Sequence, residues 1–227
     1  MNAVIVGGSH GIGSGLVSKL IDEGYTVYSF SRSRDDQAHH WFEFDIETED
    51  FPAEHLPELI NAFAYCPGSI DLKPFHRIKV EQFQKEFNIN VMGVVKCTQA
   101  VLSGLKNGNG AAVYYSTVAV NQGMPFHSSI AISKGAIEGL AKSLAAEYAP
   151  AVRFNVIAPS LTDTPLAERL LSTDAKKEAS ANRHPLKRVG TVEDLAQASY
   201  FLLSKESSWI TGQVLGVDGG MSSIRPL

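Results

Sequence analysis

The chain has 227 residues, of which 44% are hydrophobic and 19% are charged, and its formal charge at pH 7 is −4. This composition is typical of a folded globular protein and excludes a disordered or fibrous chain. Lysine and arginine form no cluster or stripe, so we expect neither nucleic acid nor a membrane as a partner. The length fits one α/β folding unit, and we predict a single domain over residues 1–227.

The cysteines and the N-terminus indicate a compartment. Cys66 and Cys97 have neither metal-site spacing nor the density of a secreted disulfide framework. Residues Met1–Val6 contain no basic region followed by a long apolar stretch, which would mark a signal peptide. His39-His40 has no partner at metal-ligand spacing. We therefore expect a cytoplasmic protein without a metal site.

Short apolar runs alternate with helical patterns along the whole chain, which predicts an α/β fold with a parallel sheet and crossover helices. One of these runs, Leu59–Tyr65, is also consistent with a strand that begins as the end of a helix. A further apolar patch, Trp41–Phe44, lies between the second and third runs. In chain order, the runs predicted as strands are Ala3–Val6, Thr26–Phe30, Leu59–Tyr65, Ala111–Tyr115 and Arg153–Ile157, with a sixth or seventh strand at Gln213–Val217.

The helical patterns lie between these runs. The first is Ile12–Glu23, where the apolar residues share one face and Gly24 follows as a stop signal. Thr164–Arg188 is the most polar long segment, and we predict that residues 164–188 form a short flap over a substrate pocket. The other predicted helices are Val80–Leu105, Ser129–Tyr148 and Thr191–Leu203, the last with a cap-like start.

A glycine-rich turn, Gly7-Gly8-Ser9-His10-Gly11-Ile12-Gly13, follows the first predicted strand and opens the first helix. Backbone amides and a helix N-terminus at such a turn can receive a pyrophosphate. The spacing is G-x-x-x-G-x-G rather than G-x-G-x-x-G, and a turn that merely uses glycine is the alternative interpretation. Its place after the first strand favours a dinucleotide-binding domain.

The second strand is followed by Ser31-Arg32-Ser33-Arg34, where a site for NAD would normally place a carboxylate. A guanidinium suits a 2′-phosphate, so we predict that NADP (NADPH) is preferred over NAD, with Arg32 as the contact and Arg34 as a possible second one. A solvated polar loop is the alternative. Asp45-Ile46 follows the Trp41–Phe44 patch, where a carboxylate can meet an adenine amino group.

These motifs and others further along resemble the short-chain dehydrogenase/reductase family of the compact type, over nearly the whole chain. The resemblance implies a Rossmann-like doubly wound parallel sheet with helices on both faces, a nicotinamide dinucleotide, and a small-molecule carbonyl or alcohol substrate. It also implies a homodimer or homotetramer that pairs the long helices. The other matching stretches are Asn90–Gly93, Ser116–Ala119, Ser133-Lys134, Asn155–Pro159, Thr164, Pro185–Gly190, Ile210–Gln213 and Asp218–Gly220.

The resemblance further implies the roles of individual residues. The family's active-site Asn, Ser and Lys fall on Asn90, Thr117 and Lys134, and its Tyr falls on Ile130. Two family motifs differ here: Asn-Asn-Ala-Gly is Tyr65-Cys66-Pro67-Gly68, and Pro-Gly is Pro159-Ser160. The residues implied to contact the cofactor are Gly7, Ser9, His10, Gly11, Ile12, Gly13, Ser31, Arg32, Asp45, Ile46, Gly68, Lys134, Pro159, Thr162 and Thr164.

Ile130 leaves the chemistry open, because its side chain can neither give nor take a proton, whereas the family's phenol does both. His127, Tyr114 and Tyr115 lie nearby in the sequence, but none has the family's position, and a polar loop or strand-end packing explains them. Retained Asn90, Thr117 and Lys134 favour an NADP-dependent oxidoreductase with an atypical site. The alternative is a weakly active or inactive NADP(H)-binding protein that acts as a sensor, scaffold or oligomer subunit.

Overall fold

The computed structural model describes residues 1–225 and contains one seven-stranded parallel sheet. The strands are β1 (Asn2–Val6), β2 (Thr26–Ser31), β3 (His40–Glu43), β4 (Ala62–Tyr65), β5 (Ala111–Tyr115), β6 (Arg153–Pro159) and β7 (Val214–Val217). Their order is β3-β2-β1-β4-β5-β6-β7. The chain therefore builds outward in both directions from the β1–β4 pair, which is the doubly wound order of a Rossmann-like fold. The predicted fold is confirmed.

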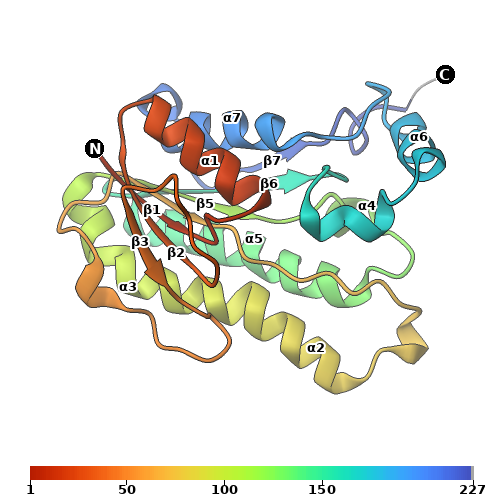
Figure 1. Ribbon diagram of the computed structural model, residues 1–227, viewed down its shortest axis with the longest axis horizontal. Coiled ribbons are helices and arrows are strands. Elements are labelled where there is room, and N and C mark those ends of the chain that lie inside the picture. Colours follow the sequence, from red (N-terminus) through yellow and green to blue (C-terminus); the bar gives the residue numbers. More distant parts are fainter. Residues whose placement is uncertain (226–227) are drawn as a thin grey trace.

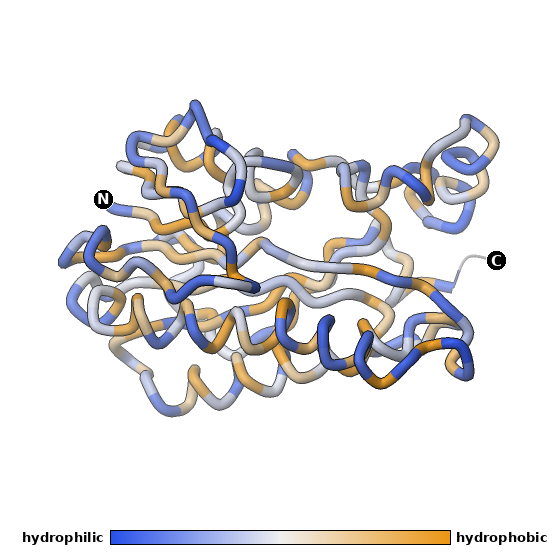
Figure 2. Tube along the Cα trace, turned by 60° about the horizontal axis from the view of Figure 1, so that its bottom comes forward, coloured by the Kyte–Doolittle hydropathy of each residue, from blue (hydrophilic) through white to orange (hydrophobic). Residues whose placement is uncertain are grey.

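Helices cover both faces of this sheet (Figure 1). On one face, α1 (Gly11–Asp22) and α7 (Val192–Leu203) pack against Ala3 and Ile5 of β1. On the other, α3 (Gly93–Gly108) and α5 (Ser128–Tyr148) pack against Val4 and Val6. Because alternate residues of a strand point to opposite faces, β1 is buried on both sides, as parallel strands normally are. Hydrophobic and hydrophilic positions alternate along the flanking helices (Figure 2).

The strand reversal between β1 and β4 places a crevice at the carboxyl edge of the sheet. Val6 at the end of β1 pairs with Tyr65 at the end of β4, and the chain leaves these two strands toward opposite faces. Ligands of doubly wound sheets bind at such a switch point. The segments that follow the strands therefore meet at one edge.

The strand predicted at Leu59–Tyr65 begins later, at Ala62, so its first three residues were assigned wrongly. Leu59 is 52% exposed. Ile60 N donates to Gly104 O at the end of α3, and Asn2 N donates to Asn61 Oδ1. These hydrogen bonds tie Ile60 to α3 and Asn61 to β1, and regular strand pairing begins at Ala62. The Trp41–Phe44 patch contributes the additional edge strand β3, whose Phe42 ring stacks on Phe30.

The helix predicted at Val80–Leu105 is interrupted. It consists of α2 (Val80–Phe87), a π-helical segment (Asn88–Met92) and α3. Tyr65 Oη donates to the carbonyl oxygen of Ile89 at 2.6 Å and so satisfies a carbonyl within the π segment. Single π turns of this kind occur frequently at functional sites. The segment holds Asn90, one of the predicted site residues.

The predicted flap, residues 164–188, contains a 3₁₀ segment (Pro165–Leu170) and α6 (Asp174–Arg183), and α6 lies beyond the sheet (Figure 1). The short helix α4 comprises Ala119–Gln122. The remaining 3₁₀ segments are Ala53–His55, Phe75–Arg77 and Lys205–Ser207. Within residues 1–225, no helix combines the length and apolar character needed to cross a membrane. The last two residues of the predicted domain lie outside the described part of the chain.

Candidate functional site

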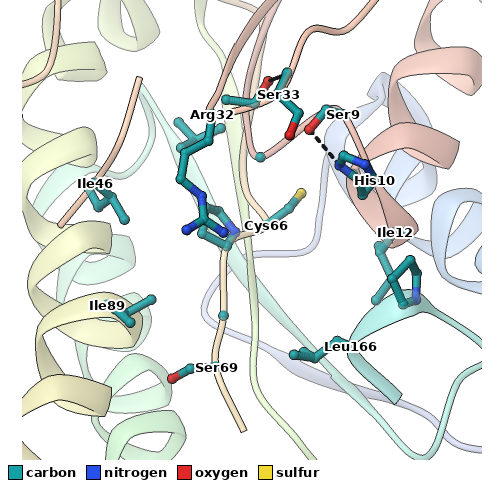
Figure 3. Close-up of a pocket in the computed structure, with 18 of the residues that line it drawn as sticks. Ser9, His10, Ile12, Arg32, Ser33, Ile46, Cys66, Ser69, Ile89 and Leu166 are labelled. Atoms are coloured by element: carbon teal, nitrogen blue, oxygen red, sulfur yellow. Dashed lines mark hydrogen bonds between the residues drawn. The ribbon is translucent and has the colours of Figure 1, made fainter. Parts of the chain in front are cut away.

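The glycine-rich turn lies at the start of a groove of about 600 Å³ along the carboxyl edge of the sheet. Gly7 and Gly11 have φ values of +78° and +54°, which residues with a side chain rarely adopt. A Cβ on Gly13 would overlap the carbonyl oxygen of Gly7. The turn can therefore bring its backbone close to a ligand in front of the N-terminus of α1. Ser9 Oγ and His10 Nδ1 are 2.9 Å apart beside it (Figure 3).

The loop after β2 presents only one of its two arginines to the groove. Arg32 lines the groove and extends across it (Figure 3). Arg34 does not line it: its Nε lies 2.6 Å from Asp36 Oδ1, and its guanidinium stands over the Trp41 ring. The hydrogen bond of Ser31 is internal to the loop, since its hydroxyl donates to Ser33 O at 2.8 Å. Arg34 as a second phosphate contact is therefore not supported.

Asp45 and Ile46 line the groove where β3 ends. Asp45 Oδ1 accepts a hydrogen bond from Glu47 N at 2.9 Å, which fixes the turn. Ile46 and Ile89 form one side wall, opposite Ile12 and Leu166 (Figure 3). The arrangement gives the groove apolar walls and a polar floor, which suits a flat ring bound between them.

A second cavity of about 320 Å³, here called the inner cavity, adjoins the groove. Gly68 and Thr164 line both spaces. Thr164 Cβ lies 3.6 Å from the position of a Cβ on Gly11, so the start of the flap packs over the glycine turn. Of the remaining predicted cofactor contacts, Pro159 and Thr162 line the inner cavity. The structure thus brings all of the predicted cofactor contacts to one continuous space.

Lys134 lies at the junction of the two spaces. It is only 9% exposed, and its Nζ lies 3.7 Å from the position that a Cβ on Gly68 would occupy. Burial lowers the pKa of Lys134 to about 8, although Cys66 and Glu86 oppose the shift. Lys134 also lines the inner cavity. The amine is therefore available to a ligand.

Asn90 lies directly below this junction but lines neither space. It is fully buried, and its Nδ2 donates to Ser69 Oγ at 3.0 Å and to Glu86 O at 2.8 Å. Its Oδ1 lies 3.4 Å from the position of a Cβ on Gly68 and has no partner within residues 1–225. A buried amide oxygen without a partner normally signals an absent water or ligand group. Asn90 is thus placed to act behind Lys134 rather than on a substrate.

Thr117 and Ile130 both line the inner cavity. Thr117 Oγ1 accepts a hydrogen bond from Ala119 N at 3.3 Å, which leaves its own hydroxyl hydrogen free to donate. Ile130 is 4% exposed and presents only hydrocarbon to the cavity. Of the predicted catalytic residues, Thr117 and Lys134 therefore share the inner cavity with Ile130, whereas Asn90 lies outside it.

The structure brings together a further pair that the sequence analysis missed. His184, near the end of the flap, is 2% exposed, and its Nε2 lies 2.8 Å from Ser160 Oγ, just after β6. Its Nδ1 lies 2.8 Å from Ser180 O. Both residues line the inner cavity. The separation of 24 positions along the chain hid the pair, and only the departure of Ser160 from the Pro-Gly motif gave a signal.

The other titratable groups near Ile130 are engaged elsewhere. Tyr114 Oη is buried 2.7 Å from Thr98 Oγ1, and Tyr115 Oη lies 2.7 Å from Ser199 Oγ on α7. His127 lines the inner cavity, with Nδ1 2.7 Å from Pro125 O. Burial raises the pKa of the Cys66 thiol to about 12, so it stays protonated. Within residues 1–225, no group of three His, Cys, Asp or Glu is placed to hold a metal ion.

These observations fit a nicotinamide dinucleotide. The positive-φ glycines leave the backbone accessible to a pyrophosphate. At the far end of the groove, the buried amine of Lys134 and Asn90 Oδ1, which has no partner within residues 1–225, can bind polar groups of a ligand. The groove and the inner cavity meet there, so that a ring bound at the junction would face a small substrate.

Comparison with known proteins decides the family. A family model described as enoyl-(acyl carrier protein) reductase matches residues 6–222. A short-chain type dehydrogenase/reductase from Mycobacterium ulcerans has a similar structure, with a TM-score of 0.90, 27% identity, and coverage of 99% of this chain and 90% of that one. The chain belongs to the short-chain dehydrogenase/reductase family. It has the nicotinamide-dinucleotide-binding fold of this family of oxidoreductases, whose members act on small molecules.

Two further family members bear on this short-chain dehydrogenase/reductase. A gluconate 5-dehydrogenase from Burkholderia cenocepacia, solved with NADP and tartrate, has a TM-score of 0.89 and 25% identity, with 99% of this chain and 96% of that chain covered. A Xanthobacter autotrophicus protein named inactive 2-(S)-hydroxypropyl-CoM dehydrogenase 2 is 38% identical over 155 residues, which cover 66% of this chain and 67% of the relative. The first indicates nicotinamide cofactor binding.

Proposed function

We propose that the protein is an NADP(H)-dependent oxidoreductase that transfers a hydride between the nicotinamide and a carbonyl or alcohol carbon, through an atypical active site. One observation carries the proposal: Gly68 lines both the groove and the inner cavity, and the buried Lys134 Nζ lies beside it, with Thr117 on the wall of the inner cavity. A binding amine and a hydroxyl donor are thus available where the cofactor space adjoins the substrate space.

The proposed roles follow from these positions. The turn Gly7–Gly13, with Ser9, His10 and Ile12, holds the pyrophosphate in front of α1. Arg32, beside Ser31, holds the 2′-phosphate, and Asp45 and Ile46 hold the adenine. Lys134 donates to the ribose hydroxyls. Gly68, Pro159, Thr162 and Thr164 surround the nicotinamide, which, when bound, supplies or accepts the hydride.

On the substrate side, Thr117 donates a hydrogen bond to the carbonyl oxygen, and Asn90 positions Lys134 through a bridging water. Ile130 stands in the place of the family's tyrosine. General acid catalysis contributes about 10²–10⁴-fold, so its loss predicts slow turnover with intact cofactor binding.

The second candidate is a weakly active or inactive NADP(H)-binding protein that acts as a sensor, scaffold or oligomer subunit. It is favoured by the hydrocarbon surface of Ile130 and by the similarity to a relative named inactive. Cofactor binding is common to both candidates, so turnover separates them.

The decisive experiment has two steps. Titration calorimetry with NADPH and NADH measures cofactor binding, and absence of binding to either would refute both candidates. Consumption of NADPH is then followed with a panel of aldehydes, ketones and quinones. Reduction of at least one compound above the rate of a Lys134→Met variant supports the oxidoreductase. Tight NADPH binding without reduction of any compound supports the second candidate, particularly if NADPH also changes the oligomeric state.

Two predictions from the resemblance complete the proposal. We propose that residues 164–188 close over the inner cavity when the cofactor binds, which protection of this segment from hydrogen exchange would test. We also propose a homodimer or homotetramer that pairs α2, α3 and α5. Light scattering coupled to size exclusion measures the mass of the assembly directly.

A further inference from the structure

The Ser160–His184 pair offers a route for the proton that Ile130 cannot carry. We propose that Ser160 accepts the proton of an alcohol substrate while its own proton passes to His184, so that the pair serves as the base for alcohol oxidation. The proposal rests on the proposed function and deepens it, because it assigns a further catalytic residue, Ser160, and a residue that acts through it, His184.

The first step of the argument is the tautomer of His184. Nδ1 lies 2.8 Å from Ser180 O, a backbone carbonyl that can only accept a hydrogen bond. Nδ1 must therefore carry the hydrogen, and in the neutral imidazole Nε2 is left as the acceptor. Ser160 Oγ lies 2.8 Å from this Nε2, so the serine hydroxyl donates to it. Met221 Sδ, 3.0 Å from Ser160 Oγ, is a much weaker competing acceptor.

The second step is the position of Ser160. Val118 N donates to Pro159 O at 3.1 Å, and Ser116 N donates to Ile157 O at 2.7 Å. The turn that holds Thr117 therefore runs beside the end of β6, and Ser160 follows at once. Ser160 and Thr117 both line the inner cavity, and the proposal places one substrate oxygen between their hydroxyl groups.

The two hydroxyl groups then have complementary roles. Thr117 retains a hydrogen to donate, whereas the hydrogen of Ser160 is held by His184, so Ser160 offers lone pairs. An alcohol oxygen can accept from Thr117 and donate its own hydrogen to Ser160. This polarity favours a bound alcohol over a bound ketone, because a ketone oxygen has no hydrogen to give to Ser160.

The proposed step balances as follows. The alcohol C–H bond breaks and its hydride passes to the oxidised nicotinamide. The alcohol O–H proton passes to Ser160 Oγ as the Ser160 proton passes to His184 Nε2. The products are a carbonyl compound, the reduced cofactor and the His184 imidazolium, which returns its proton to water through Ser160 after the product leaves. Reduction uses the same route in reverse and requires protonated His184.

The charged groups around His184 come from three elements. Arg183 is its neighbour on α6, and Lys187 N donates to His184 O. Asp218 follows β7. Its neighbour Gly219 lies against His184, since a Cβ added to Gly219 would be 3.5 Å from His184 Cβ. The Asp218 carboxylate also accepts hydrogen bonds from Gly220 N and Ser222 N, so it stays ionised near the imidazole. Its charge stabilises the imidazolium that the step forms.

The test compares wild type with Ser160→Ala, His184→Gln and Ser172→Ala, using NADP⁺ with 2-octanol, cyclohexanol and benzyl alcohol. Ser172 lies on the flap outside the inner cavity, and its variant controls for a lost flap hydroxyl. We expect kcat/KM to fall about 100-fold or more in Ser160→Ala and His184→Gln, and to stay within about twofold in Ser172→Ala. The rise of kcat/KM with pH in wild type should disappear in His184→Gln.

Further measurements separate the possible failures. Equal alcohol oxidation by wild type and both dyad variants would overturn this proposal and leave the proposed function standing. Failure of wild type with every alcohol and every carbonyl, despite NADPH binding, would overturn both. Nitrogen-15 NMR of His184 supplies a readout without turnover: a neutral ring with hydrogen on Nε2 contradicts the route. Should Ser160→Ala fail to fold, a folded Ser160→Gly variant takes its place: loss of alcohol oxidation in it supports the route, and oxidation at the wild-type rate counts against it.

Discussion

Ile130 and Lys134 lie one turn apart on α5, and both side chains face the inner cavity, with 4% and 9% of their surface exposed. A residue at position 130 therefore presents its side chain to the same space as the buried amine. The residue type at position 130 thus decides whether this wall of the inner cavity carries a group that can give or take a proton.

This relationship predicts that Ile130→Tyr raises the rate of carbonyl reduction. The new phenol would lie one turn from Lys134, whose positive charge lowers the phenol pKa. We expect an increase in kcat of about 10²-fold, at the lower end of general acid catalysis. NADPH oxidation with the best carbonyl of the panel measures it. Ile132→Tyr is the matched control, because Ile132 is on the same helix but 57% exposed. Equal rates in wild type and Ile130→Tyr, with NADPH affinity unchanged, would contradict the prediction.

Cofactor preference should depend on Arg32 and not on Arg34. Loss of a charge-assisted hydrogen bond costs about 1.5–3 kcal/mol, which corresponds to about 10- to 150-fold in affinity. We expect Arg32→Ala to weaken NADPH binding by this factor and to leave NADH binding unchanged. Arg34→Ala removes the same charge two residues away, where Asp36 already pairs with it. Calorimetry with both cofactors measures the effect, and equal losses in the two variants would mean that only overall charge matters.

Lys134 should destabilise the protein in the absence of cofactor. Its pKa of about 8 lies below the value of 10.5 for a free lysine, because burial disfavours the charged amine. The unfolded chain therefore binds more protons between these pH values, and folding stability rises with pH across this window. At about pH 7 the penalty is on the order of 3 kcal/mol.

We therefore expect Lys134→Met to be more stable than wild type at about pH 7, with the difference shrinking as pH rises from about 8 to about 10.5. Urea unfolding at several pH values measures it. The exposed Lys142→Met on the same helix controls for general loss of charge. A difference that is independent of pH would show that the amine is not buried in its charged form.

Glu86 should also destabilise the protein at neutral pH. The side chain is 5% exposed, neither carboxylate oxygen has a partner within residues 1–225, and burial raises its pKa. A raised carboxyl pKa means that stability is present at low pH and is lost as pH rises through the folded-state value.

Glu86→Gln removes this ionisation, and we expect it to stabilise the protein by about 1–3 kcal/mol at about pH 7. Glu81→Gln, on the exposed face of α2, is the control and should change stability by less than about 0.5 kcal/mol. Thermal unfolding of both variants at about pH 4 and about pH 7 shows whether the stabilisation depends on ionisation of Glu86. A stabilisation of Glu86→Gln that is equally large at the lower pH would contradict the ionisation argument.

Much of the fold and the site could be predicted because the signals were local. Apolar runs of strand length and helical periodicity specified six of the seven strands and the α/β order. The residues Gly7, Arg32, Asp45, Gly68 and Thr117 each follow a strand, and Pro159 ends one. Because parallel strands end at one edge, their gathering there follows from chain order alone. The cap at Thr191 was equally local, since Thr191 Oγ1 accepts from Asp194 N three residues away.

Other features were not accessible because they depend on contacts between distant segments. The start of β4 was predicted too early, since Ile60 bonds to Gly104 instead of to a strand. The break in the long helix at Asn88–Met92 involves Tyr65, which satisfies the Ile89 carbonyl from another element. Apolar periodicity alone carries no information on either contact.

By itself, the sequence determined the doubly wound fold, the glycine turn and the absence of a phenol at position 130, because each depends on residue type and spacing along the chain. Only the tertiary structure decided which arginine faces the groove, because Asp36 and Trp41 hold Arg34 away from it. It also decided that a buried histidine from the flap meets Ser160. The contact of His184 Nδ1 with Ser180 O fixes Nε2 as the acceptor, but no local pattern encodes the meeting of Nε2 with Ser160, 24 residues away.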